Sequence, residues 1–446
     1  MAQESKVAQG GKVAQVKHGQ LRRPHPVASL LRLVAVVVAV GLVSSACVVA
    51  YAAHDVVTTA APPVHIPHLP GHTAEPLPEA PAGQTVGEVN MLLIGTDTRT
   101  GQGQDYSDSA NQDASTGAGN NDVNILLHIS KDHSSISVVS FPRDLMIPIP
   151  SCPTASGGYS YTTSKAMLNT ALSRGGDDRH GLACAVLTIE QLTGLDIPYA
   201  ASVTFAGTSA ISTAIGGVTV CLATPIQDDN VDPPLDLKAG EQTVVGDEAL
   251  SFLRSRHGVG DGSDLGRISN QQVFMSSLAR QLTSSSTYAN PFKLFAIASA
   301  ASKNMLLSDT LNVKTLIGIV QAVQTVGLSN MVFVQYPVGE DPDDSNRVVP
   351  NAYAAGQLNQ ALIADRPIVL TGTTGDAAET DPSSTPSAGA TSPPSTPASA
   401  GSTSPATTPP ASTPAKTTAP SASVTLPPSV TGQTAAQKTC SKKGQY

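Results

Sequence analysis

Tryptophan is absent from the sequence, and aromatic residues make up only 4% of it. The hydrophobic core must therefore consist of Leu, Ile, Val and Ala rather than large rings. Charged residues are also scarce, at 13%, and the formal net charge is −8. This balance argues against the clustered basic surface that marks nucleic-acid-binding proteins. With 446 residues, the chain has room for two or three domains by length alone.

One long run without any charge lies near the N-terminus, at residues 33–53. As a helix it would span about 31 Å, which matches the hydrocarbon core of a membrane. Lys and Arg dominate residues 1–32, so we expect these residues to be cytoplasmic and the remainder of the chain to lie outside. A cleaved signal peptide is the alternative. Cys47, within the run, is expected to line the span as a small apolar residue rather than to carry a lipid.

Two other segments have compositions that do not favour a packed core. Residues 54–86 are rich in proline and lack periodicity, which predicts an extended stalk. Residues 373–446 are mostly Ser, Thr, Pro and Ala, and Lys416 is the only charge between residues 382 and 437. Such a segment cannot bury enough apolar surface to offset its ordering entropy, which predicts a disordered tail. Residues 87–372 remain as a single globular domain.

Cysteine is rare, and four of the five cysteines lie beyond the predicted span: Cys152, Cys184, Cys221 and Cys440. Their spacing does not match a zinc site. In an oxidising compartment, four cysteines can form two disulfides with three possible connectivities. We favour Cys152–Cys184 as one pair. The position of Cys440 suggests that the tip of the tail could be tied back.

Within residues 87–372, short apolar runs rich in β-branched residues alternate with helical periods. Such runs are typical of buried strands. Strands are predicted at 90–95, 123–129, 135–141 and 331–338, and helices at 164–174, 183–193, 247–256, 268–282 and 312–326. The alternation indicates an α/β fold, with a central mixed β-sheet covered by helices on both faces.

Polar side chains stand at three ends of the predicted strands. Asp97 and Arg99 follow the first strand in GTDTR, Asp122 opens the second, and Arg143 follows the third in FPRD. Open α/β sheets bind ligands at strand ends, although a structural salt bridge is the simpler explanation for each pair. Carboxylates and guanidinium groups at one site suit a phosphate ester bound with a divalent cation such as Mg²⁺.

The stretch SFLRSRHGVGDGSDLGR (251–267) concentrates charge in a chain that has little of it. Arg254, Arg256 and Arg267 flank a glycine-rich turn that carries Asp264. The simpler interpretation is a helix that ends near Arg256, because basic residues suit a helix C-terminus. The functional interpretation is that the arginines hold a polyanion, because guanidinium groups bind phosphate oxygens in pairs.

The order of the motifs resembles the LytR-CpsA-Psr family of cell-envelope proteins. Over about residues 88–275 the succession is NMLLIGTDTR, NNDVNILLHI, SVVSFPRDLMIPIP, MLNTALSRGG, TIEQLTGLDI, AIGGVTV, LKAGEQTVVGDEALSFLRSRH and GSDLGRISNQQ, with weaker agreement to about residue 365. The resemblance implies a Mg²⁺-dependent transferase that moves a glycopolymer, such as teichoic acid or arabinogalactan, from a polyprenyl-pyrophosphate carrier to peptidoglycan. The products would be a phosphodiester and polyprenyl phosphate. The composition suggests an actinobacterial source.

The resemblance also assigns roles to individual residues. Asp97 and Asp122 match the metal-linked aspartates. The residues implied to line the pyrophosphate site are Arg99, Arg143, Arg254, Arg256, Arg267 and Gln271. Arg143, Arg254 and Arg256 are implied to be catalytic, and Asp264 matches an acidic position considered as a base for the attacking hydroxyl.

Two positions depart from the family pattern. Asn120 stands where an arginine is usual, and Met167 stands where a lysine is common, with Lys165 close by. Fewer cations would weaken the binding of phosphate, which keeps open a non-catalytic paralogue that binds the wall or a lipid-linked glycan. A second alternative is a polyprenyl-pyrophosphate hydrolase, which would differ from the transferase only in whether water reaches the phosphorus. All three hypotheses place a single-pass protein in the cell membrane with its folded domain outside and no nucleic-acid partner.

Overall fold

The computed structural model describes residues 36, 62–72, 87–100, 102, 115, 118–284, 291–381 and 422–444. The chain divides into two units, Met1–Thr59 and Ala60–Tyr446. In the first unit only Val36 is described, and it is helical. No helix within the described residues is both long and apolar enough to cross a membrane. The span predicted at residues 33–53 lies outside them apart from Val36, so it stays a prediction.

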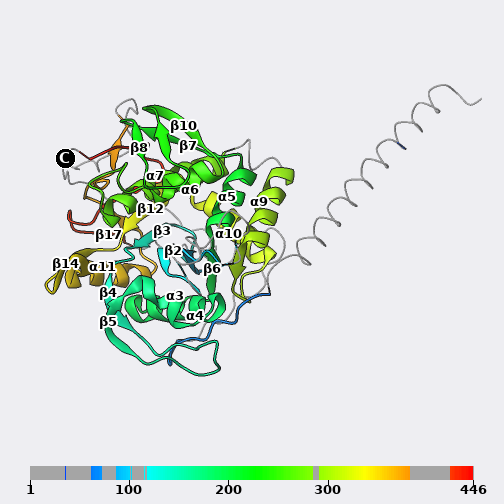
Figure 1. Cartoon of the computed structure of the whole chain (residues 1–446), viewed down its shortest axis with the longest axis vertical. Helices are drawn as coiled ribbons and strands as arrows, with labels where there is room; N and C mark the ends of the chain where they lie inside the picture. The colour runs from blue at the N-terminus through cyan, green and yellow to red at the C-terminus, as the bar shows by residue number, and fades with distance from the viewer. Residues whose placement is uncertain are drawn as a thin grey trace, which may run out of the picture. The chain divides into compact units, whose positions relative to one another are not determined.

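A seven-stranded mixed sheet forms the centre of the second unit (Figure 1). Its strand order is β11-β6-β1-β2-β3-β12-β18. The middle strands β1, β2 and β3 form an antiparallel meander, and parallel strands flank it on either side. The strands are β1 (Val89–Thr96), β2 (Asn121–Ile129), β3 (Ile136–Phe141), β6 (Tyr199–Val203), β11 (Met305–Leu307), β12 (Met331–Gln335) and β18 (Gly432–Thr434).

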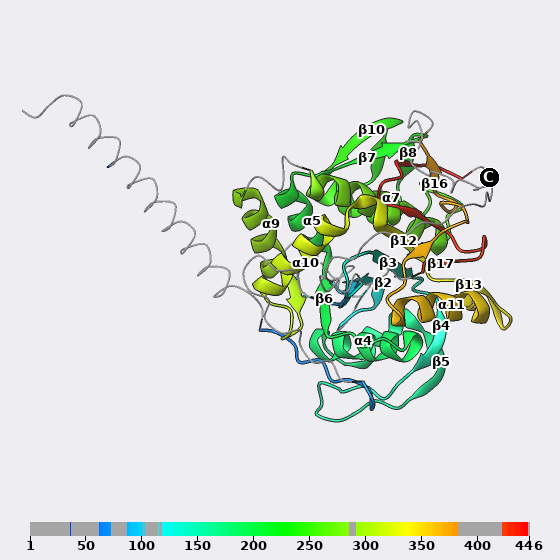
Figure 2. The same cartoon turned by 180° about the vertical axis from the view of Figure 1, so that it is seen from behind.

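Apolar side chains alternate between the two faces of this sheet, as the pleat requires. Leu92 and Ile94 belong to one core with α4 and α11, whereas Met91 and Leu93 pack on a second core with α10. Figures 1 and 2 show α4 and α7 on opposite sides of the sheet. The helices are α3 (Ala171–Arg174), α4 (Asp178–Thr193), α5 (Phe205–Ile215), α6 (Asp247–Arg254), α7 (Asp264–Thr283), α9 (Pro291–Asn304), α10 (Val313–Val326) and α11 (Ala352–Ile363). The predicted α/β architecture with helices on both faces is confirmed.

Helix α4 follows its sequence signals at both ends. The Asp177 side chain accepts a hydrogen bond from the backbone N–H of His180 and caps the first turn. Gly194 ends the helix with a φ of 76°, a left-handed conformation that glycine adopts at little cost. The predicted helix end before Gly194 is therefore confirmed.

The helix predicted over residues 164–174 is largely wrong. Residues Thr163–Met167 form strand β5, which pairs antiparallel with β4 (Met146–Ile149). A 3-10 turn at Leu168–Thr170 then leads into the short helix α3. The partner strand lies far enough back in the sequence that local periodicity carries no sign of the pairing, and tertiary pairing outweighs helical propensity here.

The tail predicted to be disordered is folded wherever the structure describes it. Residues 422–444 contain β17 (Val424–Thr425), β18 and β19 (Thr439–Ser441). Strand β18 forms an edge of the central sheet, and β19 lies between β7 and β16 in a second sheet of order β10-β7-β19-β16. The other strands are β7 (Val218–Leu222), β8 (Ile226–Asp228), β9 (Leu235–Leu237), β10 (Gly240–Val244), β13 (Val338–Asp341), β14 (Asp344–Pro350), β15 (Ile368–Val369) and β16 (Ala378–Thr380). The domain boundary expected at residue 372 is therefore wrong, because later residues complete both sheets.

Both disulfides of the described residues bear on the sequence predictions. Cys152 and Cys184 are joined, as we favoured. The second bond joins Cys221 in β7 to Cys440 in β19, directly opposite each other in the paired strands. The tip of the chain is thus tied back, in agreement with the suggestion from the position of Cys440.

The described part of the expected stalk, residues 62–72, packs onto the domain instead of extending freely. Val64 and Ile66 are each only 3% exposed and belong to the first core. Glu190, which is fully buried in α4, lies with its Oε1 2.8 Å from His68 Nδ1. The proline-rich composition did not predict this packing, because the packing depends on two buried apolar side chains and on one carboxylate that is distant in the sequence.

Candidate functional site

Asp122 and Arg143 meet where two strands of the meander lie side by side. Asp122 is the second residue of β2, and Arg143 follows β3, its antiparallel neighbour. Arg143 Nη1 donates to Asp122 Oδ2 at 2.8 Å, and Asn169 Nδ2 donates to Asp122 Oδ1 at 3.3 Å. The antiparallel register places these side chains opposite each other, as is usual for charged cross-strand pairs.

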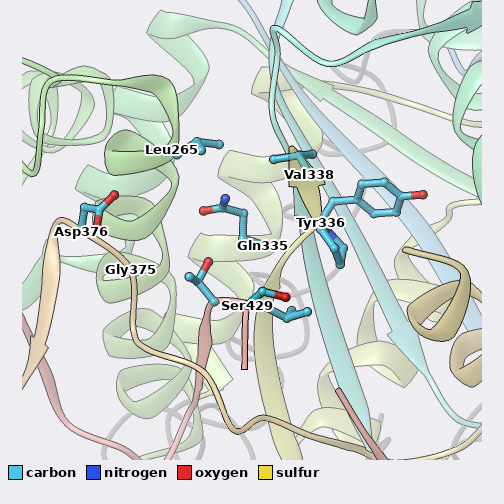
Figure 3. A pocket seen from close by; sticks show the side chains of 10 residues that line it. Leu265, Gln335, Tyr336, Val338, Gly375, Asp376 and Ser429 are labelled. Atoms are coloured by element: carbon cyan, nitrogen blue, oxygen red, sulfur yellow. The ribbon is translucent and has the colours of Figure 1, made fainter. Parts of the chain in front are cut away.

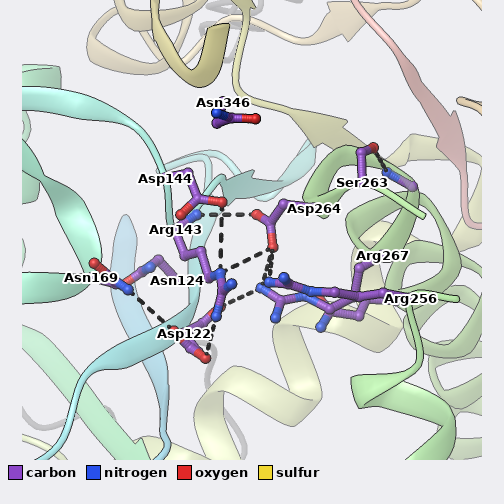
Figure 4. Close-up of polar contacts among 12 residues, drawn as sticks. Asp122, Asn124, Arg143, Asp144, Asn169, Arg256, Ser263, Asp264, Arg267 and Asn346 are labelled. Atoms are coloured by element: carbon purple, nitrogen blue, oxygen red, sulfur yellow. Dashed lines mark hydrogen bonds and ion pairs between the residues drawn. The ribbon is translucent and has the colours of Figure 1, made fainter. Parts of the chain in front are cut away.

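Asp264 is the hub of the arginine cluster (Figure 4). It is the first residue of α7, where Ser263 caps the helix, and a carboxylate is favoured at that positive end. Asp264 Oδ1 accepts from Arg256 Nη2 at 2.8 Å, lies 2.7 Å from Arg267 Nη2, and lies 3.6 Å from Arg143 Nε. Three guanidinium groups from separate parts of the chain therefore converge on one carboxylate.

A buried aspartate fixes the turn that presents Arg256. Asp228 Oδ2 accepts from Ser255 Oγ at 2.7 Å and from the backbone N–H groups of Arg256 and Gly258 at 3.2 Å each. Burial would raise the pKa of Asp228, but hydrogen bonds from Ser255, Asn230 and Gly258 outweigh it and lower the pKa. Sequence reasoning missed Asp228, since nothing near it in the chain signals contact with the 251–267 stretch.

A second residue that the sequence did not single out is Arg347, in the β13–β14 hairpin. Its Nη1 lies 3.4 Å from Asp144 Oδ1, and Asp144 in turn lies 3.7 Å from Arg143 Nε. Arg347 follows the strongest family motifs in the sequence. Only the weaker resemblance to the family, which continues to about residue 365, could have indicated a role for it. Counting Arg347, four guanidinium groups face Asp122, Asp144 and Asp264, and Arg347 also lies 3.9 Å from Asp344 Oδ2.

Mutual repulsion makes the cluster receptive to an anion. Burial lowers the pKa of Arg256, and the neighbouring Arg267 and Arg143 lower it further. For Arg143 burial acts in the same direction, but the charges of Asp122, Asp264 and Asp144 outweigh it and raise the pKa. The buried Nε atoms of Arg143 and Arg267 have no hydrogen-bond partner. A ligand with several negative oxygens at the exposed side of the cluster would relieve the repulsion.

Exposure divides the cluster into a base and a rim. The side chains of Asp264 and Arg267 are 8% and 7% exposed, whereas those of Arg143, Arg256 and Asp122 are 26%, 24% and 23% exposed. Arg143, Arg256 and Asp122 can therefore reach a ligand from solvent. Asp264 and Arg267 form the buried base that holds the other two arginines in place.

Asp97 follows β1 and Asp122 is the second residue of β2, at a point where the β1–β2 pairing is irregular, between Gly95 and Thr96. Asp97 N donates to Asn120 O, and Asp97 Oδ1 accepts from Asn120 N at 2.6 Å and from Ser115 Oγ at 3.2 Å. A Cβ at Gly119, whose φ is 69°, would lie 2.5 Å from this oxygen, so the close approach requires glycine. Both residues carry carboxylates, the ligand type that suits a hard cation such as Mg²⁺, which takes one or two carboxylates together with phosphate oxygens.

Three further residues were predicted for the pyrophosphate site: Arg254, Gln271 and Arg99. The Arg254 guanidinium lies 4.4 Å from the centre of the Phe205 ring, at the start of α5. Gln271 is 5% exposed, and its Nε2 donates to Leu253 O, a contact that packs α7 against the end of α6. Arg99 is half-buried just past β1.

The two departures from the family pattern also have a structural context. Asn120 donates from its backbone N–H to Asp97, and its Nδ2 lies 3.4 Å from the second Asp97 oxygen. Met167 ends β5 opposite Met146. Lys165 forms ion pairs with Asp341, at 2.7 Å, and with Asp343. These partners belong to the β13–β14 hairpin, so Lys165 is engaged there instead of at Asp122.

A cavity of about 170 Å³ lies beside the first turn of α7 (Figure 3). Its lining combines Leu265, next to Asp264, with Gln335 and Tyr336 at the end of β12. The C-terminal part of the chain supplies the other wall through Asp376 and Ser429. The lining is largely polar and mixes amide, hydroxyl and carboxylate groups, which suits a hydroxyl-rich ligand such as a sugar.

Comparison with known proteins gives consistent matches. Residues 69–363 match the LytR_cpsA_psr family. The cell wall biosynthesis protein LcpA of Corynebacterium glutamicum is 32% identical over 276 residues, which cover 56% of this chain and 50% of LcpA. The Bacillus subtilis polyisoprenyl-teichoic acid–peptidoglycan teichoic acid transferase TagT is 25% identical over 245 residues, 54% of this chain and 67% of TagT. The chain spans about half the length of the Corynebacterium relatives it matches.

Among solved structures, the LytR-Csp2A-Psr enzyme from Actinomyces oris aligns with a TM-score of 0.46 and 19% sequence identity. The alignment covers 67% of this chain and 95% of that protein.

Proposed function

The chain belongs to the LytR_cpsA_psr family, and from that premise we propose that it transfers a glycopolymer from a polyprenyl-pyrophosphate carrier to peptidoglycan. The observation that carries the proposal is the convergence of Arg143, Arg256 and Arg267 on Asp264, beside Asp122. The related proteins TagU and TagT are named as transferases that move teichoic acid from a polyisoprenyl carrier to peptidoglycan.

In the proposed reaction, an acceptor hydroxyl attacks the phosphorus of the sugar-linked phosphate. The bond from that phosphorus to the bridging oxygen breaks, and polyprenyl phosphate leaves with the bridging oxygen. The sugar phosphate stays on the acceptor as a phosphodiester, and the proton of the hydroxyl passes to the leaving phosphate or to water. Negative charge grows on the leaving phosphate and on the equatorial oxygens, so catalysis depends mostly on positioning and charge stabilisation. Arg143 and Arg256, at the exposed rim, would bind these oxygens.

Asp97 and Asp122 are the residues that would hold Mg²⁺ in this proposal. When bound, the cation neutralises charge on the phosphate oxygens. Asp122 also anchors Arg143 at 2.8 Å, so the carboxylate would align the arginine with the same phosphate. Asp97 is held by Asn120 and Ser115 through Oδ1, and its Oδ2 lies 3.4 Å from Asn120 Nδ2.

We assign Asp264 a positioning role in place of the base implied by the resemblance. Its Oδ1 is engaged by Arg256 and Arg267, and the side chain is only 8% exposed. A general base must reach the proton that it removes, whereas Asp264 lies beneath the arginines. Its charge holds them in a geometry ready for the diphosphate, so that little reorganisation is needed on binding.

The cavity beside Leu265 is the proposed place for the acceptor glycan. It adjoins Asp264 through the first turn of α7 and offers Gln335, Asp376 and Ser429 as hydrogen-bonding groups. In this proposal, a sugar held by these groups would present a hydroxyl toward the diphosphate bound at the arginine cluster. We further propose that residues 33–53 anchor the protein in the membrane with the folded domain outside. The two disulfides of the domain fit that oxidising side.

The proposal is tested by incubating the purified full-length chain with a polyprenyl-pyrophosphate-linked glycan, peptidoglycan and Mg²⁺. We expect glycan attached to peptidoglycan through a phosphodiester and release of polyprenyl phosphate only when peptidoglycan is present. Release without the acceptor would instead identify a hydrolase. Lipid binding without turnover would identify a non-catalytic paralogue, the alternative motivated by Asn120 and Met167.

A further inference from the structure

A second cluster of metal-ligating side chains lies at the opposite end of β2. His128 stands six residues after Asp122, about 20 Å along the strand. Glu88, His128 and Asp365 each offer one ligand atom, and these atoms lie within 4.8 Å of one another. They come from three places in the fold: the residue before β1, the end of β2, and the turn after α11.

The hydrogen bonds of Asn90 determine the tautomer of His128. Asn90 Nδ2 donates to Glu88 Oε1 and to Asp196 O, each at 2.9 Å, so the amide nitrogen must face that side. The amide oxygen then faces His128 Nδ1 at 2.8 Å and accepts a hydrogen bond from it. With the proton on Nδ1, a neutral ring has its lone pair on Nε2.

The imidazole ring is buried, since His128 is only 2% exposed. Its Nε2 lies 3.4 Å from Asp365 Oδ1, so the lone pair of this tautomer faces a carboxylate oxygen. A cation between these two acceptors would satisfy both of them.

We propose that Glu88, His128 and Asp365 bind a divalent transition metal, with Zn²⁺ the preferred ion. One imidazole nitrogen and two carboxylates suit zinc, which commonly takes three protein ligands and a water. The imidazole favours Zn²⁺ over Mg²⁺ or Ca²⁺, which prefer oxygen ligands throughout. Asn90 supplies the outer support that such sites show, because one amide orients both His128 and Glu88.

The expected consequence is structural. The ion would join the start of β1 and the end of β2 to the turn after α11, at the far end of the strands from the arginine cluster. Because the ion binds the folded state, it should raise the melting temperature. The zinc site does not depend on the proposed transferase activity, so a result that contradicts one proposal does not contradict the other.

The test uses the full-length chain, purified in detergent without a histidine tag, stripped with a chelator and titrated calorimetrically with ZnCl₂ at pH 7.5. We expect one zinc per chain and a melting temperature raised by about 4 °C or more at a hundredfold excess over the dissociation constant. Mg²⁺ at the same concentration should leave the melting temperature unchanged.

The decisive variant is Asp365→Asn. Asp365 has a φ of 52°, a left-handed conformation that asparagine also tolerates, so the variant should fold. We expect its zinc affinity to fall at least tenfold, with Glu88→Gln behaving similarly. Asp132→Asn is the matched control, because it removes a nearby charge whose carboxylate bonds Ser130 and Ser134 instead. Absence of stoichiometric binding, or binding by Asp365→Asn equal to that of the parent chain, would overturn the proposal. The second outcome would point to other ligands, such as the histidines of residues 62–72.

Discussion

Replacing Arg256 by alanine is expected to lower the rate of glycan transfer by about 10²–10³-fold. The side chain is a quarter exposed and is directed at the rim of the cluster, where phosphate charge would develop. Arg256→Lys should recover only part of this loss, since an ammonium group keeps the charge but not the two parallel donors. The measurement is the initial rate of phosphodiester formation at saturating peptidoglycan.

The matched control for this prediction is Arg174→Ala. Arg174 is at the end of α3, and its Nη1 donates to Tyr161 O at the surface, 3.4 Å away. The Arg174→Ala substitution also removes an arginine side chain from this domain. We expect its transfer rate to stay within about twofold of the rate of the parent chain. If Arg256→Ala and Arg174→Ala were equally active, the arginine cluster would not be the site of transfer.

Removing the Cys221–Cys440 disulfide should destabilise the domain more than removing Cys152–Cys184. The first bond closes 219 residues and the second 32. In the chain-entropy account, these loops correspond to about 5 and about 4 kcal/mol of stabilisation. Denaturant unfolding of the Cys221→Ser/Cys440→Ser and Cys152→Ser/Cys184→Ser variants measures the loss in free energy of unfolding for each bond.

Truncation after Asp381 should have the largest effect on stability, because it removes strands as well as the bond. It exposes the edge of β12 that β18 covers and deletes β19 from the middle of the second sheet. It also removes the buried Gln433, whose Nε2 donates to Gln272 O in α7. We expect the truncated chain to aggregate when expressed, whereas the Cys221→Ser/Cys440→Ser variant remains folded. A truncated chain with the parent melting temperature would show that residues 422–444 do not contribute to the core.

Four strands of the central sheet, β1, β2, β3 and β12, were predictable because their signals are local, whereas β6, β11 and β18 were not predicted. The runs NMLLIG and VNILLHI are apolar and β-branched over the whole strand, and both formed strands within two residues of the predicted bounds. By contrast, β18 and β19 are three-residue strands in a polar segment, GQT and TCS, which pair with the distant strands β12 and β7. Composition alone cannot reveal such pairing, because these short strands are stabilised by the neighbouring strands with which they pair.

The candidate site likewise contains residues that the sequence could place and residues that it could not. Asp122 and Arg143 could be placed together since both stand where neighbouring strands end. The hub position of Asp264 could not, because it depends on how α7 docks beside the turn after α6. Asp228 and Arg347 were missed for that reason too: each acts through a contact made only in the folded chain.

The central claim is that Arg143 and Arg256, held in place by Asp264 and Arg267, bind the diphosphate of a polyprenyl carrier. An experimental structure of the chain with polyprenyl pyrophosphate and Mg²⁺ tests it most directly. The account predicts diphosphate oxygens within hydrogen-bonding distance of Arg143 and Arg256, with Asp264 still holding Arg267 beneath them. A diphosphate seated elsewhere, with all three arginines still engaged only by Asp122 and Asp264, would contradict it.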